Sequence, residues 1–291
     1  MAHSKLILLT LLLCINAAWG DARTLISVLY SDAKNAGVET SLDVYAPASG
    51  NELPIVCWIH GGGWQIGNKE RVDLKRRALN ENGFVLASIN YRLYPSTDYK
   101  GQASDIARAI HWIKDHAREF GGSPDRIFLM GHSAGAHLAA LVSTDERYLA
   151  AEGLRLKDVR GTILLDGAAY DIPRQIELAA LPRMKQMYET VFSKDSKVQR
   201  DASPIEHVEK GKGIPPFLIL HIESRRDGKL QSEALGKAIN DAGGSAEVIS
   251  EPNKSHATIN RELGEPGDLP TKHVFEFLEK YLPALKTSES K

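Results

Sequence analysis

Apolar runs that alternate with helical segments constrain the fold of this chain more than any other feature. The predicted strands are 55–60, 84–91, 126–130, 160–165, 216–221 and 246–250. Around them, the spacing of apolar residues predicts helices over 69–82, 102–120, 133–143, 230–242 and 271–281. Apolar strands that are separated by helices are typical of a parallel sheet covered on both faces. The sequence therefore predicts an α/β fold.

Two further segments add detail to this sheet. Residues 25–30 and 40–45 alternate apolar and polar side chains, which is typical of an antiparallel pair at a sheet edge. The stretch 171–213 is much longer than the ~2–6 residues of an ordinary connection between a helix and a strand. We expect it to hold one or two helices around 182–192 that form a lid or wall. Because the sheet resumes afterwards, we expect one domain over 21–291 with about eight strands, most of them parallel.

The first twenty residues have the pattern of a secretory signal peptide. A short basic start precedes an apolar run over 6–15, and Ala18 and Gly20 stand at the −3 and −1 positions of a cut before Asp21. This run of ten residues, apolar apart from Thr10, is shorter than the ~20 that a membrane-spanning helix needs, although an uncleaved anchor remains the alternative. We expect 1–20 to be removed, and the mature chain to be secreted or periplasmic without a membrane partner.

Charge and cysteine content exclude several classes of partner. Lys and Arg number 36, and Asp and Glu number 37, so the formal net charge is −1; removal of the Lys in 1–20 gives −1 − 1 = −2. A chain this close to neutrality has no bulk positive field that would attract nucleic acid or anionic lipid. Cys57 is the one cysteine beyond residue 20, which rules out an internal disulfide in the mature chain and fits a small buried side chain. No His/Cys cluster has zinc spacing, and we expect neither a metal nor a cofactor.

The strongest functional signal is Gly-His-Ser-Ala-Gly at 131–135, which fits the pattern G-x-S-x-G. A predicted strand precedes it and an Ala-rich helix follows it, so Ser133 lies on a sharp strand-to-helix turn. There the hydroxyl is exposed above the sheet, the glycines let neighbouring backbone pass closely, and the helix N-terminus favours developing negative charge. This context predicts a nucleophile at Ser133, with an ordinary glycine-rich turn as the alternative.

A second motif, His-Gly-Gly-Gly-Trp at 60–64, follows another predicted strand. Three glycines let the backbone N–H groups of this loop converge, so they can bind the oxyanion of a tetrahedral intermediate together with the N–H of Ala134. A phosphate-binding loop is the alternative, but no Lys-Ser or Lys-Thr follows and no helix starts at once. The two motifs in this order are more specific than either one alone.

These motifs, with Ser-Ile-Asn-Tyr-Arg-Leu at 88–93 and Ser255-His256 near the end, give the chain a resemblance to the α/β-hydrolase superfamily. Within it, the chain is similar to hormone-sensitive-lipase-like and kynurenine-formamidase-like esterases, and to secreted acetylxylan or feruloyl esterases of that type. The resemblance implies the α/β-hydrolase fold and hydrolysis of an ester or amide by a serine nucleophile without a cofactor. It also implies that Gly62 and Gly63 donate to the oxyanion.

A histidine must take the proton of the serine, because a hydroxyl alone is a poor nucleophile. In this fold the chain order is Ser, acid, His, and two histidines remain beyond the strand over 216–221. His273 lies within the last predicted helix and fits a helix-surface residue. His256 lies in the loop after the last predicted strand, where a base can reach over the sheet edge, so we expect it to act on Ser133.

The acid that orients this histidine is the least defined member. Relatives often carry it four residues after a strand-end histidine, but that position is Arg225 in this sequence. Glu223 and Asp227 flank it. Asp227 begins an Asp-Gly turn and is the shorter carboxylate, so we expect Asp227 to be the acid, with Glu223 as the alternative. Asp166, which ends its strand but precedes the insertion, is a third candidate.

Together these residues predict a serine esterase. Ser133 attacks the ester carbonyl, His256 takes its proton, and water later cleaves the acyl-enzyme. The expected substrate is a small-molecule or polysaccharide-linked ester with a short acyl or aryl group, and we expect Trp64 and Tyr94 to line its pocket. Two other classes stay open: an arylformamidase-type amidase with the same catalytic residues, and a non-catalytic binding protein on this fold. The sequence does not indicate an oligomeric state.

Overall fold

A mixed but mainly parallel sheet forms the centre of the molecule. The computed structural model describes residues 23–31 and 38–282, so the expected signal peptide at 1–20 lies outside the described residues. Eight strands are ordered β1-β2-β4-β3-β5-β6-β7-β8. They are β1 (Thr24–Leu29), β2 (Ser41–Tyr45), β3 (Leu53–Ile59), β4 (Val85–Ile89), β5 (Gly122–His132), β6 (Val159–Leu165), β7 (Phe217–Ile222) and β8 (Ala246–Glu251). Pairs from β4 onward are parallel, whereas β2 is antiparallel to β1 and β4, which confirms the predicted sheet.

The register of the parallel strands brings their carboxyl ends together. Ile59 at the end of β3 pairs with Gly131 of β5, and His132 at the end of β5 pairs with Leu165 at the end of β6. The segments that follow β3, β5 and β6 therefore leave the sheet at one edge. In α/β sheets, ligands bind at this carboxyl edge.

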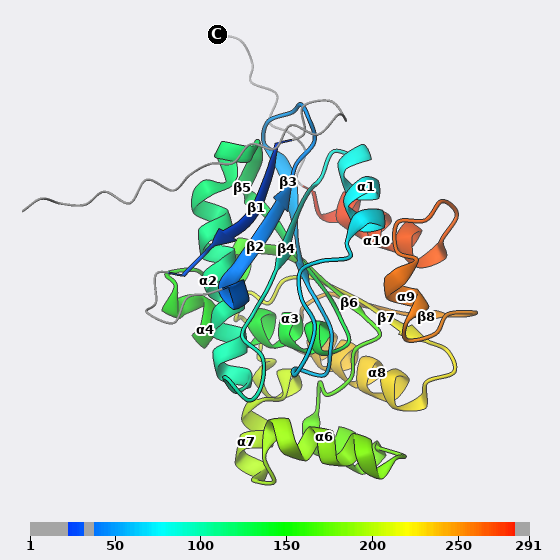
Figure 1. Cartoon of the computed structure of the whole chain (residues 1–291). Coiled ribbons are helices and arrows are strands. Elements are labelled where there is room, and N and C mark those ends of the chain that lie inside the picture. Colours follow the sequence, from blue (N-terminus) through cyan, green and yellow to red (C-terminus); the bar gives the residue numbers. More distant parts are fainter. Residues whose placement is uncertain (1–22, 32–37, 283–291) are drawn as a thin grey trace, which may run out of the picture.

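Helices cover both faces, because successive side chains of a strand point to opposite faces of the sheet. In β3, Ile55, Cys57 and Ile59 belong to one core, and Val56 and Trp58 belong to the other. The helices over the first core are α2 (Tyr99–His116), α3 (Ala134–Thr144), α4 (Glu146–Ala151) and α8 (Arg226–Asp241), and those over the second are α1 (Asp73–Glu81), α9 (Thr258–Arg261) and α10 (Leu269–Tyr281) (Figure 1). None of the described helices is long and apolar enough to cross a membrane.

The segment between β6 and β7 forms the expected helical insertion. It holds α5 (Ile172–Leu178), α6 (Pro182–Phe192), α7 (Ser196–Asp201) and a short 3-10 helix, η4 (Pro204–His207). Figure 1 shows α6 and α7 as a layer beyond the carboxyl ends of the strands. Tyr188, Val191 and Phe192 are buried in the first core, so the insertion forms a packed wall over this edge.

One helix boundary differs from the prediction in a way that matters for the site. Helix α8 begins at Arg226 rather than at 230, so Asp227 and Gly228 lie in its first turn. An acidic side chain in the first turn is favoured by the positive end of the helix dipole. The turn expected at Asp227 and Gly228 is therefore wrong.

Candidate active site

Ser133 occupies the sharp turn between β5 and α3, with φ of +56° and ψ of −119°. A positive φ at a residue with a side chain is strained and persists only when the surroundings enforce it. A Cβ atom on Gly131 would lie 2.2 Å from the Gly135 carbonyl oxygen, and one on Gly135 would lie 2.1 Å from the Ile59 oxygen. Glycine is therefore required on both sides, and the turn presents the serine hydroxyl at the carboxyl edge of the sheet.

His256 approaches Ser133 from the loop between β8 and α9. Its Nε2 lies 3.0 Å from Ser133 Oγ. The loop is fixed locally by the Ser255 N–H, which donates to Thr258 Oγ1 at 2.8 Å. It is also fixed by His132: burial lowers the pKa of His132 to about 3, and Nε2–H of the neutral ring donates to the His256 carbonyl oxygen at 2.8 Å. The structure thus brings together the predicted serine and histidine.

The carboxylate that contacts His256 is Asp166, which directly follows β6. Its Oδ2 lies 2.6 Å from His256 Nδ1, and its side chain is fully buried. Its Oδ1 accepts a hydrogen bond of 3.3 Å from the Ile222 N–H. Burial raises the pKa of Asp166, but the hydrogen bond with His256 and the charge of Arg225 outweigh it and hold that pKa below its ordinary value. Asp166 is therefore an ionised partner for the imidazole.

The expected contact between Asp227 and His256 is corrected by this geometry. Asp227 accepts from Arg225 Nε and Nη2, both at 3.1 Å, and from Gln175 Nε2 at 2.8 Å. Its position in the first turn of α8 directs it to these groups. Glu223, the alternative, is exposed, and its backbone N–H donates to the Glu251 carbonyl oxygen at 3.2 Å. Of the three carboxylates considered from the sequence, the third candidate is the one beside the histidine.

Arg225 joins the buried carboxylate of Asp166 to the partly exposed carboxylate of Asp227, and sequence reasoning missed it as a site residue. Its Nη1 donates to Asp166 Oδ2 at 3.2 Å and lies 3.3 Å from His256 Nδ1. The same guanidinium binds Asp227, so one cation holds both carboxylates in place. The sequence did contain a signal for Arg225: it stands four residues after His221, at the position where relatives often carry the acid.

The glycine loop after β3 passes directly against Ser133. A Cβ atom on Gly61 would lie 3.1 Å from the Ser133 Cβ. Gly62 has φ of +125°, and a Cβ there would lie 1.8 Å from the Ile66 carbonyl oxygen. The loop is braced by the Tyr91 hydroxyl, which donates to the His60 carbonyl oxygen at 2.8 Å. Gly62, Gly63 and Ala134 line the same cleft as the serine, as the oxyanion role requires.

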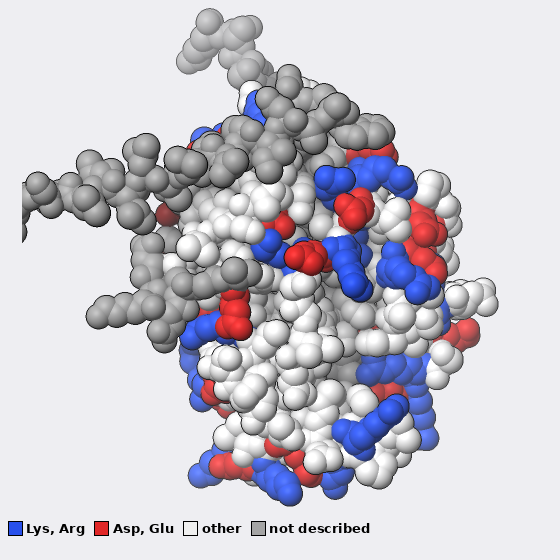
Figure 2. Space-filling model, viewed as in Figure 1, with Lys and Arg blue, Asp and Glu red and all other residues white. Residues whose placement is uncertain are grey.

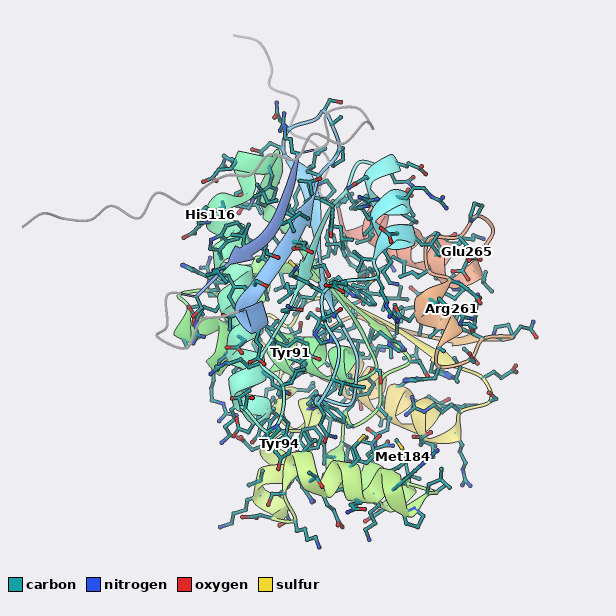
Figure 3. All side chains as sticks on the ribbon, viewed as in Figure 1. Tyr91, Tyr94, His116, Met184, Arg261 and Glu265 are labelled. Carbon is teal, nitrogen blue, oxygen red and sulfur yellow. The ribbon has the colours of Figure 1, made fainter. Side chains whose placement is uncertain are left out.

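The two predicted substrate-binding aromatics differ in position. Trp64 lines the cleft, but only 3% of its surface is exposed, because it packs against Phe192 with ring centres 4.8 Å apart. Tyr94 lies outside the cleft lining, and its N–H donates to the Trp64 carbonyl oxygen at 2.9 Å. Figure 3 shows Tyr94 well apart from Met184, which does line the cleft.

A cleft of about 1470 Å³ surrounds the serine and has two chemically distinct ends. One end is built by the insertion, with apolar side chains at Leu178, Leu181, Met184 and Met187. The other end lies between α1 and α9. Figure 3 labels one residue from each end, Met184 on α6 and Arg261 on α9.

The described part of the chain holds no group of three or more His, Cys, Asp and Glu side chains arranged to bind a metal ion. Cys57 is a free and fully buried thiol, and burial raises its pKa. It is therefore part of the core, as expected, and far from a thiolate nucleophile in character.

This arrangement defines the class of the protein. In α/β-hydrolases, a serine on the turn after a central strand meets a histidine from the loop after the last strand. The sheet order and the positions of Ser133 and His256 match that plan, and the chain has the α/β-hydrolase fold.

The chain is similar in sequence to one family model and to several known esterases. Residues 42–162 match the BD-FAE family model. Over 178 residues the chain is 34% identical to the probable carboxylic ester hydrolase LipM of Mycobacterium tuberculosis, an alignment that covers 58% of this chain and 40% of LipM. Over 236 residues it is 31% identical to the esterase LipQ of the same species, covering 76% of this chain and 55% of LipQ. The chain thus spans about half the length of these curated relatives.

A third relative and a solved structure align with nearly the whole chain. The kynurenine formamidase of Danio rerio is 26% identical over 267 residues, which cover 89% of this chain and 83% of that enzyme. The crystal structure of the carboxylesterase EstE1, cloned from a metagenomic library, superposes with a TM-score of 0.72 at 22% identity and covers 92% of both chains. The chain therefore has the α/β-hydrolase fold, and the proteins to which it is similar include carboxylesterases and a kynurenine formamidase.

Proposed function

We propose that this protein is a serine esterase whose catalytic triad is Ser133, His256 and Asp166. The observation that carries the proposal is one chain of hydrogen bonds. Ser133 Oγ lies 3.0 Å from His256 Nε2, and His256 Nδ1 lies 2.6 Å from Asp166 Oδ2. Both distances are within the reach that proton transfer requires. The esterases among the relatives support the same reaction class.

The first half-reaction forms an acyl-enzyme. Ser133 Oγ attacks the ester carbonyl carbon while His256 Nε2 takes the hydroxyl proton. Backbone N–H groups of Gly62, Gly63 and Ala134 stabilise the oxyanion of the tetrahedral intermediate. The C–O bond to the alcohol then breaks, and His256 returns its proton to the leaving alcohol. In the second half-reaction water attacks the acyl-enzyme while His256 takes its proton; the bond to Ser133 Oγ then breaks, the serine regains the proton, and the carboxylic acid leaves.

Asp166 and Arg225 set the tautomer and the electrostatic environment of His256 for this reaction. With the proton on Nδ1, the imidazole donates to Asp166 and leaves Nε2 free to accept from Ser133. The Asp166 carboxylate stabilises the imidazolium that forms in the transition state. Burial raises the pKa of Asp166, but the hydrogen bond with His256 and, next to it, the charge of Arg225 hold that pKa below its ordinary value and keep the carboxylate ionised.

The cleft favours an ester with one apolar part. Leu178, Leu181, Met184 and Met187 surround the insertion end of the cleft with flexible apolar side chains. We assign short acyl or aryl esters to this site, on a small molecule or on a polysaccharide. A chain-length series of nitrophenyl esters tests the assignment, and faster turnover of a long-chain ester than of acetate or butyrate contradicts it.

An arylformamidase activity is the second candidate. It is favoured by the kynurenine formamidase relative, whose similarity extends over 89% of this chain. The same triad would attack the formyl carbon of an amide. Turnover of N-formylkynurenine against nitrophenyl acetate and butyrate separates the two activities, and the esterase proposal predicts the higher kcat/KM for an ester.

The nucleophile is tested by Ser133→Ala. Because triad members act as a unit, the substitution should lower kcat by a factor on the order of 10⁶ while circular dichroism stays unchanged. A fluorophosphonate probe should label the natural chain and not the variant. Retention of about a tenth of the activity would place the nucleophile elsewhere. Labelling of neither protein would favour a non-catalytic binding role.

Export is a further part of the proposal. The pattern over 1–20 supports cleavage before Asp21 and a secreted or periplasmic mature chain. Expression with the native N-terminus, followed by N-terminal sequencing of the exported protein, tests this. Recovery of an uncleaved, membrane-bound chain would support an anchor instead.

A further inference from the structure

The end of the cleft between α1 and α9 holds a buried cation without an acidic partner. Lys75 on α1 lines the cleft and is 4% exposed. Its ammonium donates to the Asn260 carbonyl oxygen at 2.6 Å and lies 4.7 Å from the centre of the Trp58 ring. Both groups are uncharged. Within residues 23–31 and 38–282, no Asp or Glu forms an ion pair with Lys75.

A second buried lysine, Lys69, does have an acidic partner. Lys69 is 5% exposed, and its ammonium donates to Asp43 Oδ1 at 2.6 Å. A buried charge is strongly unfavourable unless it is paired, which explains this ion pair. Lys75 keeps its charge beside a carbonyl and an aromatic ring only, with two of its three N–H donors free of hydrogen bonds to the described residues. Its missing counter-ion is the main reason to expect an anionic ligand here.

A second polar group on the same wall also lacks a partner. The side-chain Oδ1 of Asn260, on the residue that Lys75 contacts, is buried without a hydrogen bond in the described structure. Asn260 lines the cleft and follows His256 by about one helical turn. Buried polar atoms in native structures nearly always have a partner. An unpartnered acceptor on the residue whose backbone carbonyl binds Lys75 fits a ligand that brings both an anionic group and a hydroxyl or amide proton.

The rim of this end is also basic. Arg71 and Arg261 line it, together with one acid, Glu70. The nearest carboxylate of Arg261 belongs to Glu262 at 3.6 Å, and 71% of the arginine side chain remains exposed. Figure 2 shows Lys and Arg side chains, interspersed with acidic ones, on the half of this face over α1, α9 and α8. Exposed arginines at a cleft entrance attract anions and bind them through charge-assisted hydrogen bonds.

We propose that the α1–α9 end of the cleft is a subsite for a carboxylate on the ester substrate. The substrate class is an ester with a neutral apolar part, which occupies the insertion end, and an acidic part, which reaches Lys75 and the arginine rim. One buried ammonium balances one negative charge, which matches a carboxylate better than the dianion of a phosphate monoester. This inference rests on the proposed esterase function and names the substrate class of that same site.

Lys75 has a competing explanation, in which it merely ties α1 to the helix that follows His256. In that case the loss of its charge moves His256 and slows all esters alike. The two explanations therefore differ in the ratio of kcat/KM between an anionic ester and its neutral counterpart, and not in activity alone.

The test compares matched esters on the natural protein. One series consists of nitrophenyl hemiesters of dicarboxylic acids from adipate to sebacate, each against its methyl-capped, neutral form. A second pair places the charge on the alcohol part: 4-acetoxybenzoate against methyl 4-acetoxybenzoate. We expect at least one anionic ester to exceed its neutral counterpart in kcat/KM by roughly tenfold, the size of one charge-assisted hydrogen bond.

Three variants assign the effect to the subsite. Lys75→Met should remove the preference for the anionic ester, and Arg71→Gln, at the exposed rim, should reduce it severalfold. Arg77→Gln is the control: it removes one positive charge from the exposed face of α1, the helix that carries Lys75, and should leave the preference for the anionic ester intact. If Lys75→Met does not fold, Arg71→Gln still tests the proposal against Arg77→Gln.

The outcomes separate this inference from the proposed function. Equal or faster turnover of every neutral ester overturns the subsite and leaves the esterase intact. The subsite is also excluded if Lys75→Met and Arg71→Gln slow both members of each pair equally. If the natural protein hydrolyses no ester, titration calorimetry of Ser133→Ala with the preferred-length hemiester still decides the subsite. Tighter binding of the acid than of its methyl ester supports it, and equal binding refutes it.

Discussion

At the scale of single residues, Arg225 contacts both Asp166 and Asp227, of which only Asp166 has a hydrogen bond with His256 among the described residues. Its guanidinium binds Asp166 at 3.2 Å and Asp227 at 3.1 Å. Asp166 also forms a hydrogen bond with His256, whereas Asp227 forms its hydrogen bonds with Arg225 and Gln175. Asp227 therefore influences the imidazole only through the arginine, and its removal leaves the direct partner of His256 in place.

The two carboxylates make a matched pair of variants. Asp166→Asn should lower kcat by ~10⁴, because the amide no longer holds the correct imidazole tautomer or stabilises its cation. Asp227→Asn should lower kcat by only roughly tenfold, because Asp227 supports Arg225 and does not contact His256; outer-shell partners of metal ligands have effects of similar size. Both are measured on one ester, with circular dichroism as the control for folding. A collapse of Asp227→Asn beside a nearly normal Asp166→Asn would reverse the assignment of the acid.

Lys75 should make the stability of the fold depend on pH. Burial lowers its pKa from 10.5 to about 8, so between these pH values the unfolded chain binds more protons than the folded chain. Stability therefore rises as the pH increases through this window, and full protonation below it costs the fold up to about 3 kcal/mol.

Urea unfolding of the natural protein and Lys75→Met, at several pH values across this window, measures the effect. The difference in the free energy of unfolding should move in favour of the natural protein as the pH rises. A difference that stays flat would mean that Lys75 titrates as an ordinary exposed lysine.

Sequence reasoning could identify Ser133 and His256 because local signals surround each. The serine has a pentapeptide between a strand and a helix, and His256 follows the last strand. His273, in α10, pairs instead with Glu251 at the end of β8, with 2.8 Å between His273 Nδ1 and Glu251 Oε1. Asp166 has no such signal, because its distance to His256 depends on how strands far apart in the chain are arranged in space.

At the scale of elements, the glycine loop after β3 needs glycine at Gly62, because the backbone there leaves no room for a Cβ atom. Gly62→Ala would place a Cβ 1.8 Å from the Ile66 carbonyl oxygen at a φ of +125°. The loop must shift, and its N–H donors shift with it. We expect kcat to fall by a factor on the order of 10² to 10³, the cost of one lost oxyanion donor.

Gly83→Ala is the control for this change. Gly83 also has a positive φ, +77°, but no atom lies within 4 Å of a Cβ there. The control should lose about 1 kcal/mol of stability and keep its kcat. Equal kcat values for the two variants would exclude a catalytic role for the loop at Gly62.

The start of α8 shows where local sequence signals mislead. Arg225 to Gly228 are polar and end in Asp-Gly, a pair typical of turns. In the structure, Gly228 lies in a helix, and a Cβ there would lie 3.2 Å from Asp166 Oδ1. The glycine allows α8 to pack closely against the carboxylate, a tertiary reason that local propensity does not contain.

At the scale of the whole molecule, the insertion and the sheet share one core. Phe192 at the end of α6 is fully buried, and its ring contacts Trp64 at 4.8 Å and His137 at 5.2 Å between centres. Trp64 belongs to the glycine loop and His137 to α3. The insertion is therefore continuous with the core that supports Ser133, and we expect both to unfold together.

Phe192→Ala tests this continuity. The substitution should lower the free energy of unfolding by about 3–5 kcal/mol, as large-to-small changes of buried aromatics do. Far-UV circular dichroism and tryptophan fluorescence should still report one coincident transition. Leu181→Ala, at a residue that is 48% exposed, should change stability little. Two separated transitions would mean that the insertion folds as its own unit.

The sheet as a whole was accessible from the sequence because it follows from patterns repeated along the chain. Apolar runs between helices predicted the parallel strands, and the alternating segments at 25–30 and 40–45 predicted the antiparallel edge. What the insertion packs against could not be predicted, since contacts such as Phe192 with Trp64 join residues far apart in the chain. Export and cleavage at 1–20 stay predictions.

Because the proposed acid, Asp166, follows β6, the turn after β7 contains no member of the proposed triad. Ser224 lies in that turn and Arg226 is the first residue of α8; both flank Arg225, are exposed, and line the cleft. Selection can vary these two positions without altering the proposed reacting atoms or Arg225, so they are evolvable positions of the protein. In directed evolution, libraries randomised at Ser224 and Arg226 would explore new substrates at little risk to turnover.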